Sequence, residues 1–78
     1  MDWIKENNHL YREFTFSNFT EAVNFVNKLV PLANEADHHP DILIHSYKKV
    51  KVLLTTHEKG EVTDKDYSLA NEINNIGQ

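Results

Sequence analysis

The hydrophobic period changes from two residues to about 3.6 within residues 9–36, HLYREFTFSNFTEAVNFVNKLVPLANEA. The first part alternates and is rich in aromatic residues, which predicts a strand with one side formed by Leu10, Arg12, Phe14 and Phe16. The second part has apolar residues at helical spacing, which predicts a helix with an apolar stripe of Phe19, Ala22, Val23, Val26, Leu29, Val30 and Ala33. A strand therefore leads directly into an amphipathic helix.

The helix is expected to run from Asn18 to Ala36. Asn18, with Glu21 three residues later, resembles a capping box and marks the beginning of the helix. Pro31 lies inside the pattern and predicts a kink or a break, because proline lacks a backbone donor and crowds the preceding turn.

Three further strands flank this stretch. On its N-terminal side, Trp3 to Glu6 reads as a strand, and Asn7-Asn8 suits a two-residue hairpin turn because asparagine tolerates a positive φ. On its C-terminal side, Ile42 to Tyr47 and Val50 to Thr56 predict a hairpin about Lys48-Lys49. Lysines are unusual at a positive φ, so a longer or bulged turn and the strand register both stay open.

A loop over residues 57–61 leads to Thr63, which is expected to cap a final helix with a buried side of Leu69, Ala70, Ile73 and Ile76. The order strand-strand-helix-strand-strand-helix predicts an α+β fold in which two helices pack on one face of a four-stranded antiparallel sheet. We expect a single domain over residues 1–78. Its small core and lack of disulfides favour self-association.

Composition excludes several classes of protein. The net charge is −4, and no basic run is present, which argues against direct binding of nucleic acid. No apolar run approaches the roughly 18 residues of a membrane span, and no signal peptide is visible. The chain has no cysteine, which rules out disulfides and thiolate metal sites and is consistent with a cytoplasmic location.

Histidines gather in one part of the chain. His38, His39, His45 and His57 lie within 20 residues of sequence that also hold Asp41 and are flanked by Asp37 and Glu58. Histidine exchanges protons near neutral pH, so this cluster predicts general acid and base chemistry. His45 reads as a strand surface residue and is assigned no function.

The predicted hairpin brings the cluster together. Its second strand returns near the start of its first, so His57 is expected close to His38 and His39. Asp66, in the first turn of the last helix, is expected to reach back and orient His57. Three histidines could also bind zinc, but adjacent rings rarely reach one ion, so metal-free chemistry is preferred.

An ordered set of motifs resembles the pterin-4a-carbinolamine dehydratases. It has the family's His-His-Pro, aromatic, Thr-His and downstream Asp at matching spacings, in the residues Asp37-His38-His39-Pro40-Asp41, Tyr47, Thr56-His57-Glu58 and Asp66. Residues 14–22 resemble the family's second strand and first helix, so the resemblance covers nearly the whole chain.

The resemblance implies a fold, an assembly and a reaction. The fold is the four-stranded antiparallel sheet with helices on one face, and the assembly is a homodimer or homotetramer whose sheet continues across subunits. The reaction removes water from a 4a-hydroxy-tetrahydropterin to give a quinonoid dihydropterin, without a cofactor or a metal, and recycles the pterin.

The resemblance also implies residue roles. His38 and His57 would be the acid and base, with the assignment between them open. His39 would hold and polarise the pterin, and Asp66 would orient or charge-stabilise a histidine. The substrate pocket would be lined by Asp37, Pro40, Thr56, Glu58 and Lys59.

Two positions depart from the family pattern. Asn34 stands where family members usually carry an acidic residue, and Glu61 replaces a common loop glycine, with Gly60 one place earlier. Two alternatives to catalysis therefore stay open. One is a pterin-binding module with little turnover, and the other is a dimerisation cofactor like the animal members that act with a homeodomain transcription factor.

Overall fold

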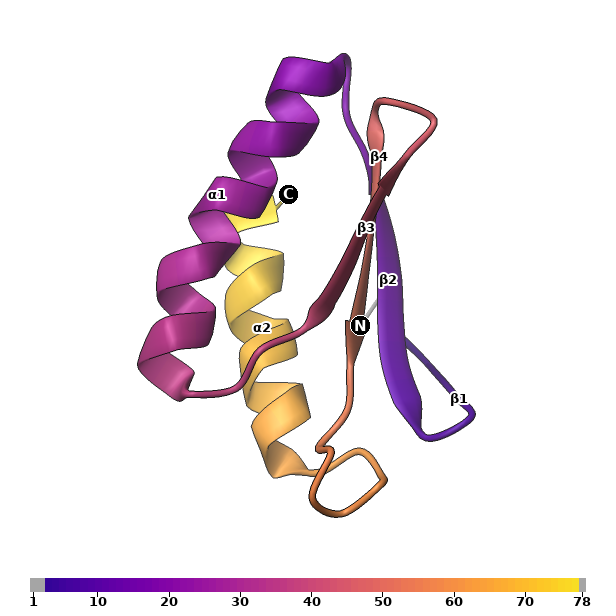
Figure 1. Cartoon of the computed structure of the whole chain (residues 1–78), viewed down its shortest axis with the longest axis vertical. Helices are drawn as coiled ribbons and strands as arrows, with labels where there is room; N and C mark the ends of the chain where they lie inside the picture. The colour runs from indigo at the N-terminus through magenta and orange to yellow at the C-terminus, as the bar shows by residue number, and fades with distance from the viewer. Residues whose placement is uncertain (1–2, 78) are drawn as a thin grey trace.

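The computed structural model describes residues 3–77. Met1, Asp2 and Gln78, which the single-domain prediction includes, lie outside the described residues. The elements follow in the order β1 (Ile4–Glu6), β2 (His9–Thr15), α1 (Phe19–Ala36), β3 (Asp41–His45), β4 (Lys49–Leu54) and α2 (Asp64–Gly77), as Figure 1 shows. The predicted α+β class and order of elements are confirmed.

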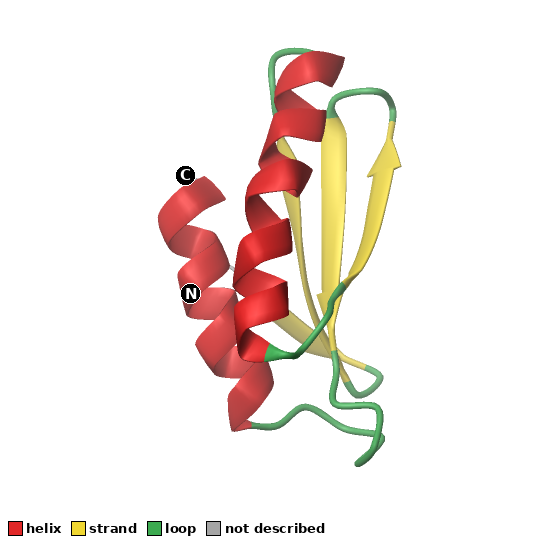
Figure 2. Cartoon of the chain, turned by 60° about the vertical axis from the view of Figure 1, so that its left-hand side comes forward, coloured by secondary structure: helices red, strands yellow, loops and turns green. Residues whose placement is uncertain are grey.

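The four strands form one antiparallel sheet in the order β1-β2-β4-β3. The central strands β2 and β4 pair in register, with Leu10 opposite Leu54 and Phe14 opposite Val50. All four of these side chains are buried. Both helices lie on the face that these side chains form, as predicted, and Figure 2 shows the opposite face of the sheet without a helix over it.

The core lies between the sheet and the two helices. Its buried members come from every element except the short edge strands β1 and β3, and they are Trp3, Leu10, Phe14, Ala22, Phe25, Leu29, Val50, Val52, Leu54, Leu69, Ala70 and Ile73. The predicted stripe of α1 is partly wrong, because Phe19 and Val30 are 55% and 49% exposed. The Phe25 ring is buried and lies 4.6 Å from that of Phe14, between ring centres.

Side-chain capping explains where α1 begins. The Oδ1 atom of Asn18 accepts the Glu21 N–H at 2.8 Å, and the Glu21 carboxylate accepts the Ser17 N–H at 3.0 Å. These bonds satisfy donors that the first helical turn leaves free. The helix runs through Pro31 as one element, so the predicted break there is wrong.

The other end of α1 turns the chain sharply. Asp37 adopts a left-handed conformation, with φ 51°, and its N–H donates to carbonyls of the last helical turn. The next N–H, that of His38, donates to the Ala33 carbonyl at 3.1 Å. This cap ends the helix and sends residues 38–40 across to the start of β3.

One of the two hairpin turns differs from the prediction. Asn7 and Asn8 have positive φ angles of 52° and 67°, as expected. The second hairpin turns over residues 46–48, where Ser46 and Tyr47 each have φ 51°, so the turn begins before Lys48 and Lys49 is already in β4. The strand pairing begins at His45 and Lys49, which keeps both lysines out of the left-handed region.

Candidate active site

Asp66 is a buried carboxylate that joins three parts of the chain. It is 0% exposed and lies in the first turn of α2. Its Oδ2 accepts the Thr63 N–H at 2.8 Å and the Thr56 hydroxyl at 2.9 Å, and its Oδ1 lies 2.5 Å from Nε2 of His38. The carboxylate therefore links the end of β4, the start of α2 and the segment after α1.

This bond determines which nitrogen of His38 carries a proton. An ionised carboxylate only accepts hydrogen bonds, so Nε2 of His38 is the donor. The neutral ring then has an unprotonated Nδ1 that can accept a proton. The His38 side chain is only 11% exposed, so the ring is held in a partly enclosed place.

The prediction that Asp66 orients His57 is wrong, because the carboxylate bonds to His38 instead. The two helices pack against each other. This packing brings the start of α2 to the C-terminal end of α1, where His38 follows the helix cap (Figure 1). Sequence spacing does not reveal which helix ends meet.

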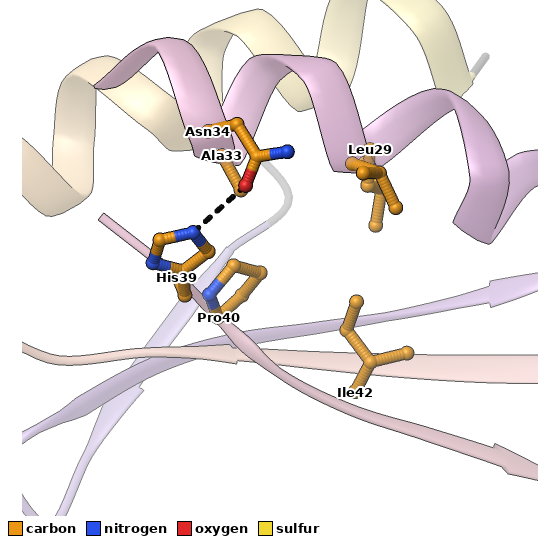
Figure 3. Close-up of a pocket in the computed structure, with 7 residues that line it drawn as sticks. Leu29, Ala33, Asn34, His39, Pro40 and Ile42 are labelled. Carbon is orange, nitrogen blue, oxygen red and sulfur yellow. Dashed lines mark hydrogen bonds between the residues drawn. The ribbon is translucent and has the colours of Figure 1, made fainter. Parts of the chain in front are cut away.

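His39 has a different partner. Its Nε2 lies 3.0 Å from Oδ1 of Asn34, in the last turn of α1. Figure 3 shows the amide oxygen directed at the ring, and both residues line a hollow of about 120 Å³. Asn34 and His39 are the polar members of its lining, and the other members are Leu29, Val30, Ala33, Pro40 and Ile42.

The loop after β4 folds back on itself. The Thr56 N–H donates to the Glu61 carbonyl at 3.1 Å, and the Gly60 N–H donates to the Thr56 carbonyl at 2.9 Å. Gly60 has φ 66°, which glycine adopts without strain. The chain therefore uses the glycine at position 60 to close this loop, with Glu61 in the closing bridge.

Two further hollows meet at the start of α2. The larger, of about 460 Å³, is lined in part by Thr56, Glu58 and Lys59. The other, of about 370 Å³, is lined in part by His38. Asp64 and Lys65 line both. His38 and three of the predicted pocket residues therefore lie around these hollows, at one end of the molecule.

Two predicted site residues stand apart from these hollows. His57 is exposed in the loop, lines none of the three hollows, and its ring makes no hydrogen bond within residues 3–77. Its loop lies at the same end of the molecule as the start of α2 (Figure 1). Asp37 is exposed and contributes the backbone cap of α1.

Two members of the site are not predicted from the sequence. Thr63 is expected only as a helix cap, but its hydroxyl lies 2.7 Å from that of Thr56 and extends the network around Asp66. The bond of Asn34 to His39 is the other. A threonine three residues before an aspartate is the pattern that could have suggested the bond from the Thr63 N–H to Asp66.

Two other properties bear on the type of site. Within residues 3–77, no three histidine, cysteine or carboxylate side chains are grouped so that they could hold a metal ion. Over the same part of the chain, neither helix combines the length and hydropathy that crossing a bilayer requires.

Comparisons with known proteins identify the family. The family described as pterin 4 alpha carbinolamine dehydratase matches residues 1–76. A protein of Sulfolobus acidocaldarius with the name "Putative pterin-4-alpha-carbinolamine dehydratase" is 50% identical over 74 residues, which cover 95% of this chain and 80% of that protein. A protein of the same name from a Picosynechococcus species is 53% identical over 75 residues, 96% of this chain and 80% of the relative.

Solved structures agree on the fold. A transcriptional coactivator/pterin dehydratase from Brucella melitensis superposes with a TM-score of 0.91 at 32% identity, over 99% of this chain and 83% of that one. A pterin dehydratase-like protein described as a RuBisCO assembly factor shares the fold, with a TM-score of 0.75 at 17% identity over 96% and 86% of the two chains. The chain belongs to the pterin-4-alpha-carbinolamine dehydratase family.

Proposed function

We propose that this protein dehydrates a 4a-hydroxy-tetrahydropterin to a quinonoid dihydropterin by histidine acid and base catalysis, and so recycles the pterin. The observation that carries this proposal is the bond between the buried Asp66 carboxylate and Nε2 of His38. A histidine held in one tautomer by a buried carboxylate is a recurring arrangement for a general base.

The proposed reaction needs two proton transfers. A ring N–H gives up its proton, the bond between C4a and the hydroxyl oxygen breaks, and that oxygen gains a proton and leaves as water. We assign the base to His38, because its Nε2–H is committed to Asp66 and its Nδ1 is left to accept. The acid is then His57, whose ring has no protein partner within residues 3–77.

The substrate pocket is proposed around the start of α2. Thr56, Glu58 and Lys59 line one hollow there, and His38 lines its neighbour. Pro40 follows the adjacent histidines His38 and His39 and lines the same hollow as His39. Asp37 acts through its backbone, because its N–H caps α1 and the turn there positions His38 and His39.

The test is the rate of 4a-hydroxy-tetrahydropterin dehydration, followed by absorbance, for the wild type, His38→Ala and His57→Ala. A positioned acid or base contributes roughly 10²–10⁴-fold, so each variant should lose about that factor in kcat. His9→Ala is the matched control, because His9 lies in the β1–β2 hairpin and lines none of the hollows. Wild-type turnover in both site variants would reject the proposal. Pterin binding without acceleration by the wild type would favour the binding module instead.

We also propose that the protein works as a homodimer joined along β3. Within residues 3–77 this strand pairs with β4 alone, so its outer edge has free backbone donors and acceptors. Its sequence, Asp-Ile-Leu-Ile-His, is self-complementary in the antiparallel direction. Pairing about Leu43 sets Asp41 against His45 of a second copy, and Leu43 itself is 53% exposed.

A further inference from the structure

The two adjacent histidines are both held through Nε2, but by partners of different charge. His38 bonds to Asp66, which belongs to α2 and is completely buried. His39 bonds to Asn34, which belongs to α1 and is exposed. One ring therefore has a carboxylate partner and the other a neutral amide.

We propose that Asn34 is a positioning residue that holds His39 in the tautomer protonated on Nε2, so that His39 meets the substrate through Nδ1 as a hydrogen-bond acceptor. The amide oxygen of Asn34 faces Nε2 at 3.0 Å, and an oxygen acceptor requires a proton on that nitrogen (Figure 3). A neutral imidazole has one N–H, so Nδ1 carries a lone pair.

The backbone prepares this contact. The left-handed cap at Asp37 ends α1, and Pro40 restricts His39 to an extended conformation. The chain therefore doubles back after α1, and the His39 ring faces a residue of the last helical turn. Asn34 and His39 are the polar side chains of a small hollow whose other lining is apolar, so each is the other's polar neighbour there.

The amide separates the roles of the two rings. A carboxylate can balance a positive charge on its histidine, whereas an amide accepts the same hydrogen bond without charge. His39 then holds a substrate N–H as a neutral acceptor, while His38 takes the proton. This second step depends on the proposed function. The ligand group that His39 recognises is an N–H on the edge of a nitrogen heterocycle.

The tautomer can be measured without any turnover. In protein with ¹⁵N-labelled histidine, two-bond ¹H–¹⁵N spectra at a pH where the rings are neutral distinguish the two N–H tautomers. The His39 signals are assigned by their loss in His39→Gln. The wild type should show His39 protonated on Nε2. Asn34→Leu, which keeps the size but removes the acceptor, should give a mixture of tautomers, and Asn34→Asp should retain the wild-type tautomer.

Asn27→Leu is the matched control, because it makes the same change on an exposed position of the same helix, about 10 Å away along its axis. It should leave the His39 spectrum unchanged. A wild-type ring protonated on Nδ1, or a spectrum of Asn34→Leu identical to that of the wild type, would overturn the proposal.

Kinetics test the second step separately. Asn34→Leu should raise the KM for the pterin by roughly 2- to 10-fold, the equivalent of one neutral hydrogen bond, with a smaller change in kcat. A loss in kcat with KM unchanged would contradict an orienting role. If the wild type does not accelerate dehydration at all, the proposed function fails, and the tautomer spectra still decide the role of Asn34.

Discussion

Replacement of Asp66 by asparagine should separate the two roles of this buried carboxylate. The carboxylate accepts from three donors: the Thr63 N–H, the Thr56 hydroxyl and Nε2 of His38. An amide of the same shape has one accepting oxygen and one donating nitrogen. In Asp66→Asn, either the two threonine donors or His38 can therefore keep an oxygen acceptor, but not both.

The backbone donor should keep the oxygen. The Thr63 N–H is fixed at the start of α2, and an unsatisfied buried donor costs about 1–3 kcal/mol. The imidazole of His38 can instead move its proton to Nδ1 and accept from the new NH₂ group. That tautomer has no lone pair on Nδ1, so the proposed base loses its function, and kcat should fall by roughly 10²–10⁴-fold.

Stability should fall as well, because a neutral amide replaces hydrogen bonds to a charged group. A loss of about 2 kcal/mol is expected, which lowers the Tm of a domain of this size by about 8–16 °C.

The assays are dehydration kinetics at a temperature where the variant is folded, urea unfolding, and the ¹⁵N spectrum of His38. Thr55→Ala is the control, since it removes one buried hydroxyl, which donates to the Asn8 carbonyl at 2.8 Å and contacts neither Asp66 nor the hollows. It should lose about 1 kcal/mol of stability and retain its turnover. A folded Asp66→Asn protein with wild-type kcat would refute the reasoning.

Three further predictions concern the turns and the sheet edge. In Gly60→Ala the new Cβ meets no atom within 4 Å, so only the strain of a positive φ should lower the free energy of unfolding, by about 1–2 kcal/mol in urea. A loss above about 4 kcal/mol would contradict an open site. Replacing Ser46-Tyr47 by Asn-Gly, which suits two successive positive φ angles, should raise the free energy of unfolding by about 1 kcal/mol, and a decrease would count against the turn geometry. Leu43→Lys should shift the protein to a monomer in sedimentation equilibrium, and an unchanged mass would reject pairing along β3.

The periodicity of the sequence was sufficient to predict the elements. The change of period near Ser17 correctly predicted β2 and α1, and the apolar positions of α2 correctly predicted its buried side. The sequence pattern was less informative about where a hairpin turns, because two neighbouring turn positions fit the same alternation of residues. The turn of the second hairpin covers residues 46–48 and begins before the expected Lys48-Lys49, and its register stayed open, because register depends on which residues of β4 face the core.

The site residues illustrate a different limit. The resemblance named His38, His39 and Asp66, but it did not specify which histidine the carboxylate would hold. That choice depends on how α1 packs against α2, which is a tertiary property. The Asn34 partner was equally hidden, because the left-handed cap at Asp37 reverses the chain and is not visible as a glycine in the sequence.

The bond from His38 to Asp66 spans 28 positions of the chain and joins a residue after α1 to one in α2. It requires the start of α2 to lie against the C-terminal end of α1, and the same carboxylate also accepts from Thr56, which follows β4. A partly folded chain with α1 and the sheet in place would still lack an oriented base. Enzymatic turnover should therefore report the complete tertiary structure, and its loss in urea should coincide with the global unfolding transition.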